Sequence, residues 1–301
     1  MEANSSVGRD PMTHCPLVSV VIPCRNGAAT LGRQLAALSR QDYEGAWEVV
    51  LADNGSTDGS PAIAEAWRAR LPRLLVVGAS RAGINVARNA GVRASHGQIV
   101  ALCDADDEVA PAWLSGLVGA VASGSQLVGG CLDLEPLNSN LPPGRRRRRT
   151  ELADDLGFLP WPEGANVAFS REVFDRLNGF DETFVFGGDE IEFAWRAQLA
   201  GFSLAFAPEA VVHYSVRASA RRLFRQFLGY GSSHAQLYRQ FRTHGMPGSR
   251  AKLVIGRWVW ILAHAPAAIV RRGEDREAVL RRAGIVVGRI RGSLKYRVLY
   301  L

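Results

Sequence analysis

The chain has 301 residues, 47% of them hydrophobic, with a formal net charge of +7. This is enough apolar material for a full core, in one large α/β domain with a tail or in two small domains. Four cysteines show no CxxC pair and no metal-ligand spacing. That pattern disfavours a zinc site or a disulfide framework and favours a reduced, cytoplasmic protein with buried thiols.

The charge is divided unevenly along the chain. Residues 217–301 hold sixteen Arg and two Lys against three acids, a net charge of +15, so the first 216 residues carry −8. A basic tail on an acidic body indicates an anionic partner for the tail, either lipid headgroups or nucleic acid. Residues 1–15 are polar and lack the apolar segment of a secretory signal, so we expect a disordered lead-in.

The first half of the chain alternates short β-branched runs with helical patterns. We predict strands over residues 17–23, 47–52, 74–77 and 99–103, and helices over 30–39, 61–70 and 81–97. Strand and helix alternating at this spacing indicate βαβ units and a parallel sheet. Ligands of such sheets bind beyond the carboxyl ends of the strands, where Asp53 and Asp104 both lie.

The sequence IVALCDADDEV places Asp104, Asp106 and Asp107 directly after a buried strand. Three acids in four residues repel one another unless a cation lies among them. An Asp-x-Asp pair suits Mg²⁺ or Mn²⁺, with a diphosphate completing the coordination. The alternative is a solvated acidic turn before the helix that begins near Pro111.

The helix predicted over 81–97 carries Arg81, Arg88 and Asn89 on one face. Arginines near a helix start and close to strand ends are well placed to bind phosphates. In the alternative interpretation, Arg88 extends over the sheet and pairs with an acid.

Taken in order, the stretches VVIPCRN, ADNGSTDGS, AGINVARNAG and ALCDADD resemble the nucleotide-binding half of a family 2 glycosyltransferase with the GT-A fold. The stretches GANVAFSREVF, LNGFDETF, GGDEIEFAWRAQLAGF and FAPEAVVHYS continue the resemblance, which covers residues 16–216. It implies an α/β fold with a Rossmann-like, mixed and mostly parallel sheet flanked by helices. Residues 217–301 would be a basic, helical extension to this domain.

The resemblance also implies roles for individual residues. For donor binding it indicates Pro23, Arg25, Asp53, Arg81, Arg88, Asp104 and Asn166. In this assignment Asp53 contacts the base and Asp104 the ribose of a sugar nucleotide. Asp106 and His213 would hold the divalent cation, although a histidine after three apolar residues is also compatible with a structural role.

Relatives carry Glu-Asp-x-Asp or Glu-Asp-x-Glu at the later acidic motif, and the second acid is usually the base. Here the stretch is Asp189-Glu190-Ile191-Glu192, so the first two acids are exchanged. Glu190 aligns with the base, and Asp189 is the alternative. Acids in a first helical turn are also favoured by the helix dipole alone, which is the structural interpretation of this motif.

The remaining segments concern the acceptor and the surroundings of the enzyme. Trp161 could line the acceptor side, and the arginine run 145–149 is predicted as an exposed loop that could instead attract an anionic acceptor. An amphipathic basic helix follows residue 220, and the apolar segment 253–270 is short and interrupted for a membrane span. We expect it to lie at a membrane interface or to pack on the domain.

The sequence therefore predicts an inverting, metal-dependent glycosyltransferase with a carboxylate base and a nucleotide-sugar donor. UDP is the expected carrier because it is the commonest in the family, and GDP and dTDP are the alternatives. The enzyme would be cytoplasmic and peripheral at the inner membrane face, with a lipid-linked or cell-envelope acceptor. A nucleotidyltransferase-like enzyme and a non-catalytic nucleotide- or anion-binding module are the alternatives. A nucleic-acid partner is not expected, because the body is acidic and such a role would leave its carboxylates unused.

Overall fold

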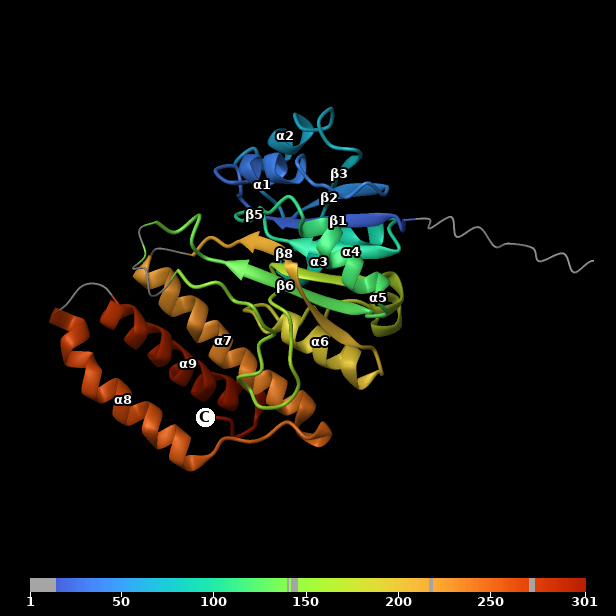
Figure 1. Cartoon of the computed structure of the whole chain (residues 1–301). Coiled ribbons are helices and arrows are strands. Elements are labelled where there is room, and N and C mark those ends of the chain that lie inside the picture. Colours follow the sequence, from blue (N-terminus) through green and yellow to red (C-terminus); the bar gives the residue numbers. More distant parts are fainter. Residues whose placement is uncertain (1–14, 140, 142–145, 217–218, 271–273) are drawn as a thin grey trace, which may run out of the picture.

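A computed structural model of the chain describes residues 15–139, 141, 146–216, 219–270 and 274–301 (Figure 1). Residues 1–14 of the predicted lead-in and Arg145 of the arginine run lie outside the described residues. Cys24, Cys103 and Cys131 are buried as free thiols, as predicted, and Cys15 is exposed.

One eight-stranded sheet forms the centre of the molecule, in the order β3-β2-β1-β4-β7-β6-β8-β5. The strands are β1 (Val18–Cys24), β2 (Trp47–Asp53), β3 (Leu74–Gly78), β4 (Ile99–Cys103), β5 (Glu108–Val109), β6 (Leu127–Asp133), β7 (Asn166–Ser170) and β8 (Leu204–His213). Parallel pairs join β1 to β2 and β4, β2 to β3, and β6 to β8. Antiparallel pairs join β7 to β4 and β6, and β5 to β8. The predicted mixed, mostly parallel sheet is confirmed.

Helices cover both faces of the sheet because its buried strands are apolar on both sides. In β1, Val20 packs in one hydrophobic cluster and the next residue, Val21, in the other. The first cluster contains residues of α1 (Leu31–Leu38), α2 (Ser60–Glu65) and α4 (Trp113–Ala122). The second contains residues of α3 (Ile84–Ala94), α5 (Arg171–Leu177) and α6 (Asp189–Leu199).

Two predicted helices are shorter than expected. The helix predicted over 61–70 ends at Glu65 and continues as turns. The helix predicted over 81–97 begins only at Ile84, because Gly83 precedes it with a positive φ of 152° and donates its N–H to the side chain of Asn54. That bond ties the start of α3 to the loop after β2.

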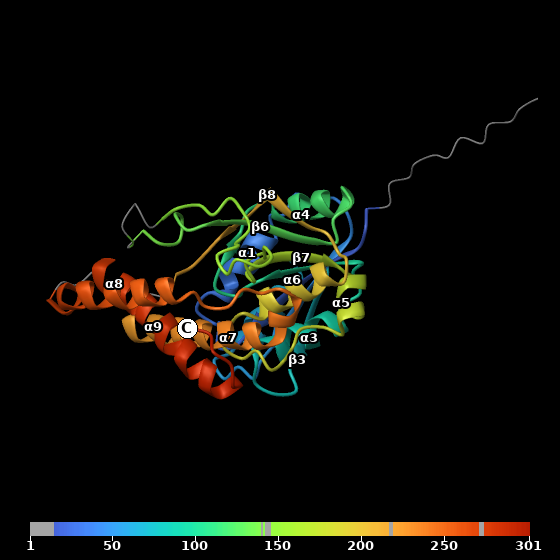
Figure 2. The same cartoon turned by 90° about the horizontal axis from the view of Figure 1, so that it is seen from below.

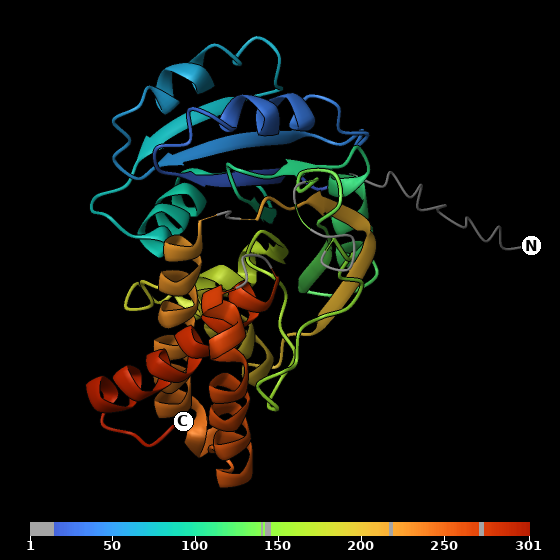
Figure 3. The same cartoon turned by 90° about the vertical axis from the view of Figure 1, so that its left-hand side faces the viewer.

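Three long helices make up the C-terminal part: α7 (Ala220–Phe241), α8 (Ala251–Val270) and α9 (Glu274–Tyr296), with a short 3-10 helix, η2 (Arg242–His244), after α7. Figures 1 and 2 show α7 against the body, α9 against α7, and α8 against α9. Figure 3 shows the three helices grouped beneath the sheet. Side chains of α7, including Leu237 and Phe241, join the second hydrophobic cluster. Residues on both sides of the boundary predicted at residue 216 therefore share one hydrophobic core.

Glycines allow the backbones of α7 and α9 to come into direct contact. Gly284, Gly288 and Gly292 follow one another at four-residue intervals and form one stripe of α9. A Cβ atom built on Gly288 would lie 2.2 Å from the carbonyl oxygen of Leu228 in α7. Any larger residue at this position would force the two helices apart.

No helix in the described part of the chain has the length and hydropathy that spanning a bilayer requires.

Candidate active site

The turn after β4 gathers the predicted acidic cluster. The side chain of Gln34, buried in α1, donates to the main-chain oxygen of Asp104 over 3.0 Å and accepts the N–H of Val109 over 3.0 Å. These two bonds clamp both ends of the turn. Its three carboxylates, from Asp104, Asp106 and Asp107, offer oxygen atoms that all lie within 4.8 Å of one another.

These carboxylates fit a divalent cation. Carboxylate oxygens are the ligands that Mg²⁺ and Mn²⁺ prefer, and three of them at this spacing match a shared ion. Asp107 also accepts the N–H of Ser215 over 2.8 Å, which joins the turn to the segment after β8. His213, at the end of β8, pairs across the sheet with Glu108 and is not a member of the three-carboxylate group.

A cavity of about 690 Å³ opens beside this turn. Its charged lining comes from several elements: Asp104 and Asp106 after β4, Arg88 in α3, Glu163 before β7, Asp189 and Glu190 in the first turn of α6, and Arg222 and Arg225 in α7. The cavity thus combines a carboxylate group suited to a cation with several guanidinium groups suited to phosphate.

Arg88 and Asp189 form an ion pair in which both side chains are buried. Burial alone would lower the pKa of Arg88, but the negative charges of Asp189, Asp104 and Glu190 outweigh it, so the pKa is raised. The guanidinium also donates to the main-chain oxygen of Gly164 over 3.4 Å. Because its carboxylate is bound by Arg88, Asp189 is poorly placed to accept a proton from a substrate.

Glu190 projects from the first turn of α6. The helix begins after Gly188, which adopts a left-handed conformation with φ of 78° that favours glycine. Burial, followed by the nearby charge of Asp189, raises the pKa of Glu190 to about 8, although Arg88 acts in the opposite direction. A carboxylate with a pKa near neutrality is a competent general base.

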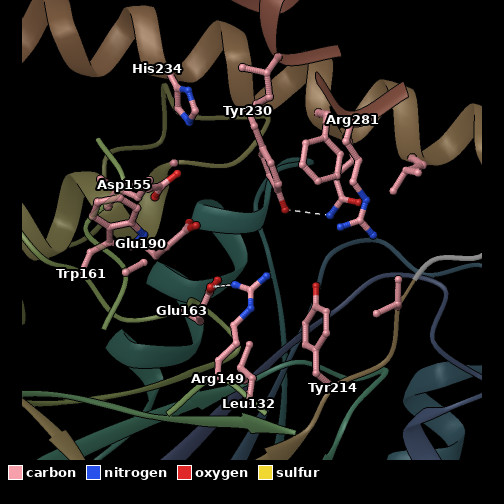
Figure 4. Close-up of a pocket in the computed structure, with 18 of the residues that line it drawn as sticks. Leu132, Arg149, Asp155, Trp161, Glu163, Glu190, Tyr214, Tyr230, His234 and Arg281 are labelled. Atoms are coloured by element: carbon pink, nitrogen blue, oxygen red, sulfur yellow. Dashed lines mark hydrogen bonds and ion pairs between the residues drawn. The ribbon is translucent and has the colours of Figure 1, made fainter. Parts of the chain in front are cut away.

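A second cavity, of about 560 Å³, meets the first at Glu190. Both cavities are lined by Glu163, Glu190, Tyr214, Gln226 and Tyr230. Figure 4 shows Glu190 and Trp161 on one side of the second cavity, with Tyr214 and Tyr230 facing them. Glu190 therefore lies where a ligand in one cavity would meet a ligand in the other.

Comparison with known proteins assigns the family. A model of the glycosyl transferase family 2 matches residues 19–177, more than half of the chain, and one of the glycosyl transferase family group 2 matches residues 99–271. The chain belongs to family 2 of the glycosyltransferases. It is an enzyme with a GT-A fold, and the predicted family, fold class and enzyme class are confirmed.

Similar proteins include glycosyltransferase AglE of Haloferax volcanii, 29% identical over 70% of this chain and 71% of that protein. Validoxylamine A glucosyltransferase of Streptomyces hygroscopicus subsp. jinggangensis is 30% identical over 66% of this chain, but the match spans only 55% of that protein. Among solved structures, the mannosyltransferase PcManGT from Pyrobaculum calidifontis, in complex with GDP-Man and Mn²⁺, has a TM-score of 0.68 at 20% identity. That likeness covers 94% of this chain and 88% of the other, and so includes the C-terminal helices.

In this glycosyltransferase, three predicted donor residues lie at neighbouring strand ends. Pro23, in β1, is buried, and Arg25 is exposed one residue beyond that strand. Asp53 ends β2 opposite Cys24, and its carboxylate accepts the N–H of Ser56 over 3.2 Å. These residues lie at the carboxyl edge of the sheet but outside the lining of the first cavity.

Two other predicted donor residues are engaged elsewhere. Arg81 is exposed and pairs with Glu182 over 2.6 Å, outside the lining of either cavity. Asn166 is fully buried: its amide oxygen accepts the indole N–H of Trp113 over 2.8 Å, and its amide nitrogen donates to two main-chain oxygens. Gly164 and Ala165 line the cavity in its place.

Sequence reasoning did not assign Arg222 and Arg225 to the donor site. Both belong to the predicted amphipathic basic helix after residue 220, and both line the cavity that contains Asp104 and Asp106. Both side chains are exposed and form no ion pair in the described part of the chain. Their spacing of three residues on a basic helix places them on one face, but only the packing of α7 shows which surface that face meets.

Proposed function

We propose that the enzyme transfers a sugar, with inversion, from a nucleotide-sugar donor in the first cavity to an acceptor hydroxyl in the second. The observation that carries this proposal is the position of Glu190 between the two cavities. In an inverting displacement the acceptor loses its proton on one side of the sugar while the bond to the diphosphate breaks on the other. A base at the junction of the two cavities and a carboxylate group for a cation in the first cavity match this requirement.

The bonds formed and broken define the role of Glu190. The acceptor oxygen bonds to the anomeric carbon as the bond from that carbon to the diphosphate oxygen breaks. The hydroxyl proton passes to the Glu190 carboxylate, and the nucleoside diphosphate leaves with the bonding electrons. Asp189 and Arg88 fix the start of α6, and Asp189 raises the proton affinity of Glu190.

The cation site belongs to the donor cavity. Asp106, with Asp107 beside it, would hold Mg²⁺ or Mn²⁺, and His213 is the further ligand expected from the family resemblance. When bound, the cation neutralises negative charge on the leaving diphosphate. Arg222 and Arg225, which line the same cavity, would contact the same diphosphate as charged donors suited to phosphate oxygens.

The rest of the donor site is proposed from the family resemblance. Asp53 would contact the base and Asp104 the ribose, with Pro23 and Arg25 beside them at the same sheet edge. We propose UDP as the carrier. The structures similar to this chain include complexes with GDP-Man, UDP and UDP-GlcNAc, so the carrier is the first point to test.

A thermal-shift screen tests donor binding directly. UDP, GDP, dTDP and CDP are each added with Mn²⁺, with Mg²⁺ or with EDTA. A ligand at about 100 times its Kd adds about 2.7 kcal/mol to the free energy of unfolding. We expect one nucleotide to stabilise the wild type only with metal, and Asp106→Asn to abolish that shift. If no nucleotide shifts the wild type, the proposed donor site is wrong.

We also propose that the enzyme is cytoplasmic and attaches peripherally to the inner face of a membrane. The support is an exposed apolar surface on α8, where Ile255, Trp258, Val259 and Leu262 share one face and are 38–68% exposed. Together with the charge of +15 on residues 217–301, this surface suits an interface with anionic lipid. A lipid-linked or cell-envelope acceptor would then be reached at that interface.

Vesicle co-sedimentation tests the membrane proposal. Leu262→Glu should reduce binding to vesicles containing phosphatidylglycerol, because it places a charge in the exposed apolar surface of α8. Leu199→Glu changes an equally apolar residue on α6, 44% exposed, and serves as the matched control. Equal binding by wild type and Leu262→Glu would rule out α8 as the contact.

A further inference from the structure

The second cavity carries positive charge at the end formed by the C-terminal helices. Arg257 of α8 and Arg289 of α9 both line it, and each donates to the main-chain oxygen of Leu301 over 3.2 Å. Arg289 is buried, and its guanidinium also lies 3.2 Å from Nδ1 of His234 in α7. Three separate helices thus bring polar nitrogen groups to one end of this cavity.

Electrostatics at this end favour an anion. Burial, followed by the charges of Arg289 and Arg257, lowers the pKa of His234 far below its usual range, so His234 stays neutral and accepts from Arg289. Burial lowers the pKa of Arg289 to about 10; Arg257 acts in the same direction, and Tyr300 and Asp155 act in the opposite direction. The two guanidinium groups lie close together, because both donate to the main-chain oxygen of Leu301.

Of the side-chain carboxylates that line the cavity, Asp155 acts on Arg289 and raises its pKa. Asp155 and Glu190 line the same cavity, but in the described part of the chain neither forms an ion pair with Arg257 or Arg289. The third carboxylate, Glu163, is bound by Arg149. At neutral pH much of Glu190 carries its proton, which removes a further negative charge from the cavity.

Resting on the proposed function, we propose that the second cavity binds an acceptor that carries a phosphate or carboxylate group. That group would contact Arg257 and Arg289, while a hydroxyl of the same molecule reaches Glu190. The volume of about 560 Å³ suits a phosphorylated or carboxylated sugar or polyol. Trp161, Tyr214 and Tyr230 supply aromatic surface along its length (Figure 4).

The transfer step itself is unchanged by this assignment. The acceptor hydroxyl still forms the new bond to the anomeric carbon, its proton still passes to Glu190, and the nucleoside diphosphate still leaves. The anionic group takes no part in bond making. It holds the acceptor in position, because charged hydrogen bonds to guanidinium are both stronger and more directional than neutral ones.

The test uses the full chain with its donor site filled by Mg²⁺ and the nucleoside diphosphate that the screen selects. Inorganic phosphate is the probe, measured by thermal shift in the wild type, Arg257→Gln and Lys252→Gln. Lys252 is exposed on the same helix and lines neither cavity, so it controls for loss of one positive charge. We expect Arg257→Gln to weaken phosphate binding about tenfold, Lys252→Gln to leave it unchanged, and Arg257→Lys to restore part of it.

Turnover with matched acceptors provides the second readout. Glycerol is compared with glycerol 3-phosphate, and glucose with glucose 6-phosphate and glucuronate, while a polyprenyl phosphate in detergent tests a lipid-borne source. Preference for charged members supports the proposal, and the best substrate shows whether the anion is free or lipid-linked. Equal turnover of the neutral and the charged acceptors would overturn the proposal. It would also be overturned if phosphate stabilised wild type and Arg257→Gln equally, or stabilised neither. The nucleotide shift and its loss in Asp106→Asn are recorded on the same samples, so failure here is distinguishable from failure of donor binding.

Discussion

Replacing Glu190 by glutamine should make the stability of the enzyme depend differently on pH. The pKa of Glu190 is about 8 in the folded chain, against an ordinary value of 4.5. Between these values the folded chain binds a proton that the unfolded chain has lost, so the free energy of unfolding falls as the pH rises. In Glu190→Gln the side chain does not titrate, so this fall in the free energy of unfolding is absent.

The size of the effect follows from the two pKa values. Each pKa unit corresponds to about 1.4 kcal/mol, which gives an upper limit of about 5 kcal/mol above pH 8. For a chain of this size, 1 kcal/mol moves the Tm by about 2–4 °C. We therefore expect Glu190→Gln and wild type to have similar Tm values near pH 4.5, with the variant more stable by several degrees at pH 9.

Differential scanning fluorimetry between pH 4.5 and 9 measures this difference without a known acceptor. Glu135→Gln, which removes a carboxylate from an exposed loop, is the control. The kinetic counterpart is kcat/KM, which should fall about tenfold per pH unit below pH 8, because the base must be ionised. A pH-independent Tm difference together with a flat kcat/KM from pH 6 to 9 would refute the assignment and leave Asp189 as the next candidate.

Two further predictions concern the C-terminal helices. The double variant Arg222→Ala/Arg225→Ala should weaken metal-dependent binding of the nucleoside diphosphate at least tenfold. Arg221→Ala, on the same helix but outside the cavity lining, should leave the affinity unchanged. Equal affinities of wild type and double variant by calorimetry would exclude these arginines from the donor site. Gly288→Ala should lower the Tm by several degrees, because its Cβ would meet the carbonyl oxygen of Leu228. Gly256→Ala, with open space around it in α8, should leave the Tm unchanged or slightly raised.

Local patterns were sufficient to predict the sheet and its acidic turn. Apolar runs that end in Asp53 and Asp104 mark buried parallel strands, and the order of such runs fixes the carboxyl edge as the binding side. Glu190 could be aligned as the base, but its preference over Asp189 depends on the ion pair of Asp189 with Arg88, which joins residues 101 positions apart.

Features that depend on long-range packing could not be predicted in this way. Asn166 follows small residues as a donor-site residue would, yet its side-chain amide is bound by residues of β6, β8 and α4. The role of Arg222 and Arg225 depends on where α7 docks. The sequence around them is equally compatible with a helix on a membrane surface. A membrane surface and a phosphate-binding cavity both favour basic residues next to apolar ones.

The glycine stripe of α9 changes how the C-terminal part can be studied. Since α7 and α9 touch through their backbones, shortening α9 would displace the helix that supplies Arg222 and Arg225 to the donor cavity. A truncated enzyme that lost activity would therefore look like one detached from its membrane, although the cause would be an incomplete donor site. Single substitutions on the outer surface of α8 separate these two causes, and removal of residues 217–301 does not.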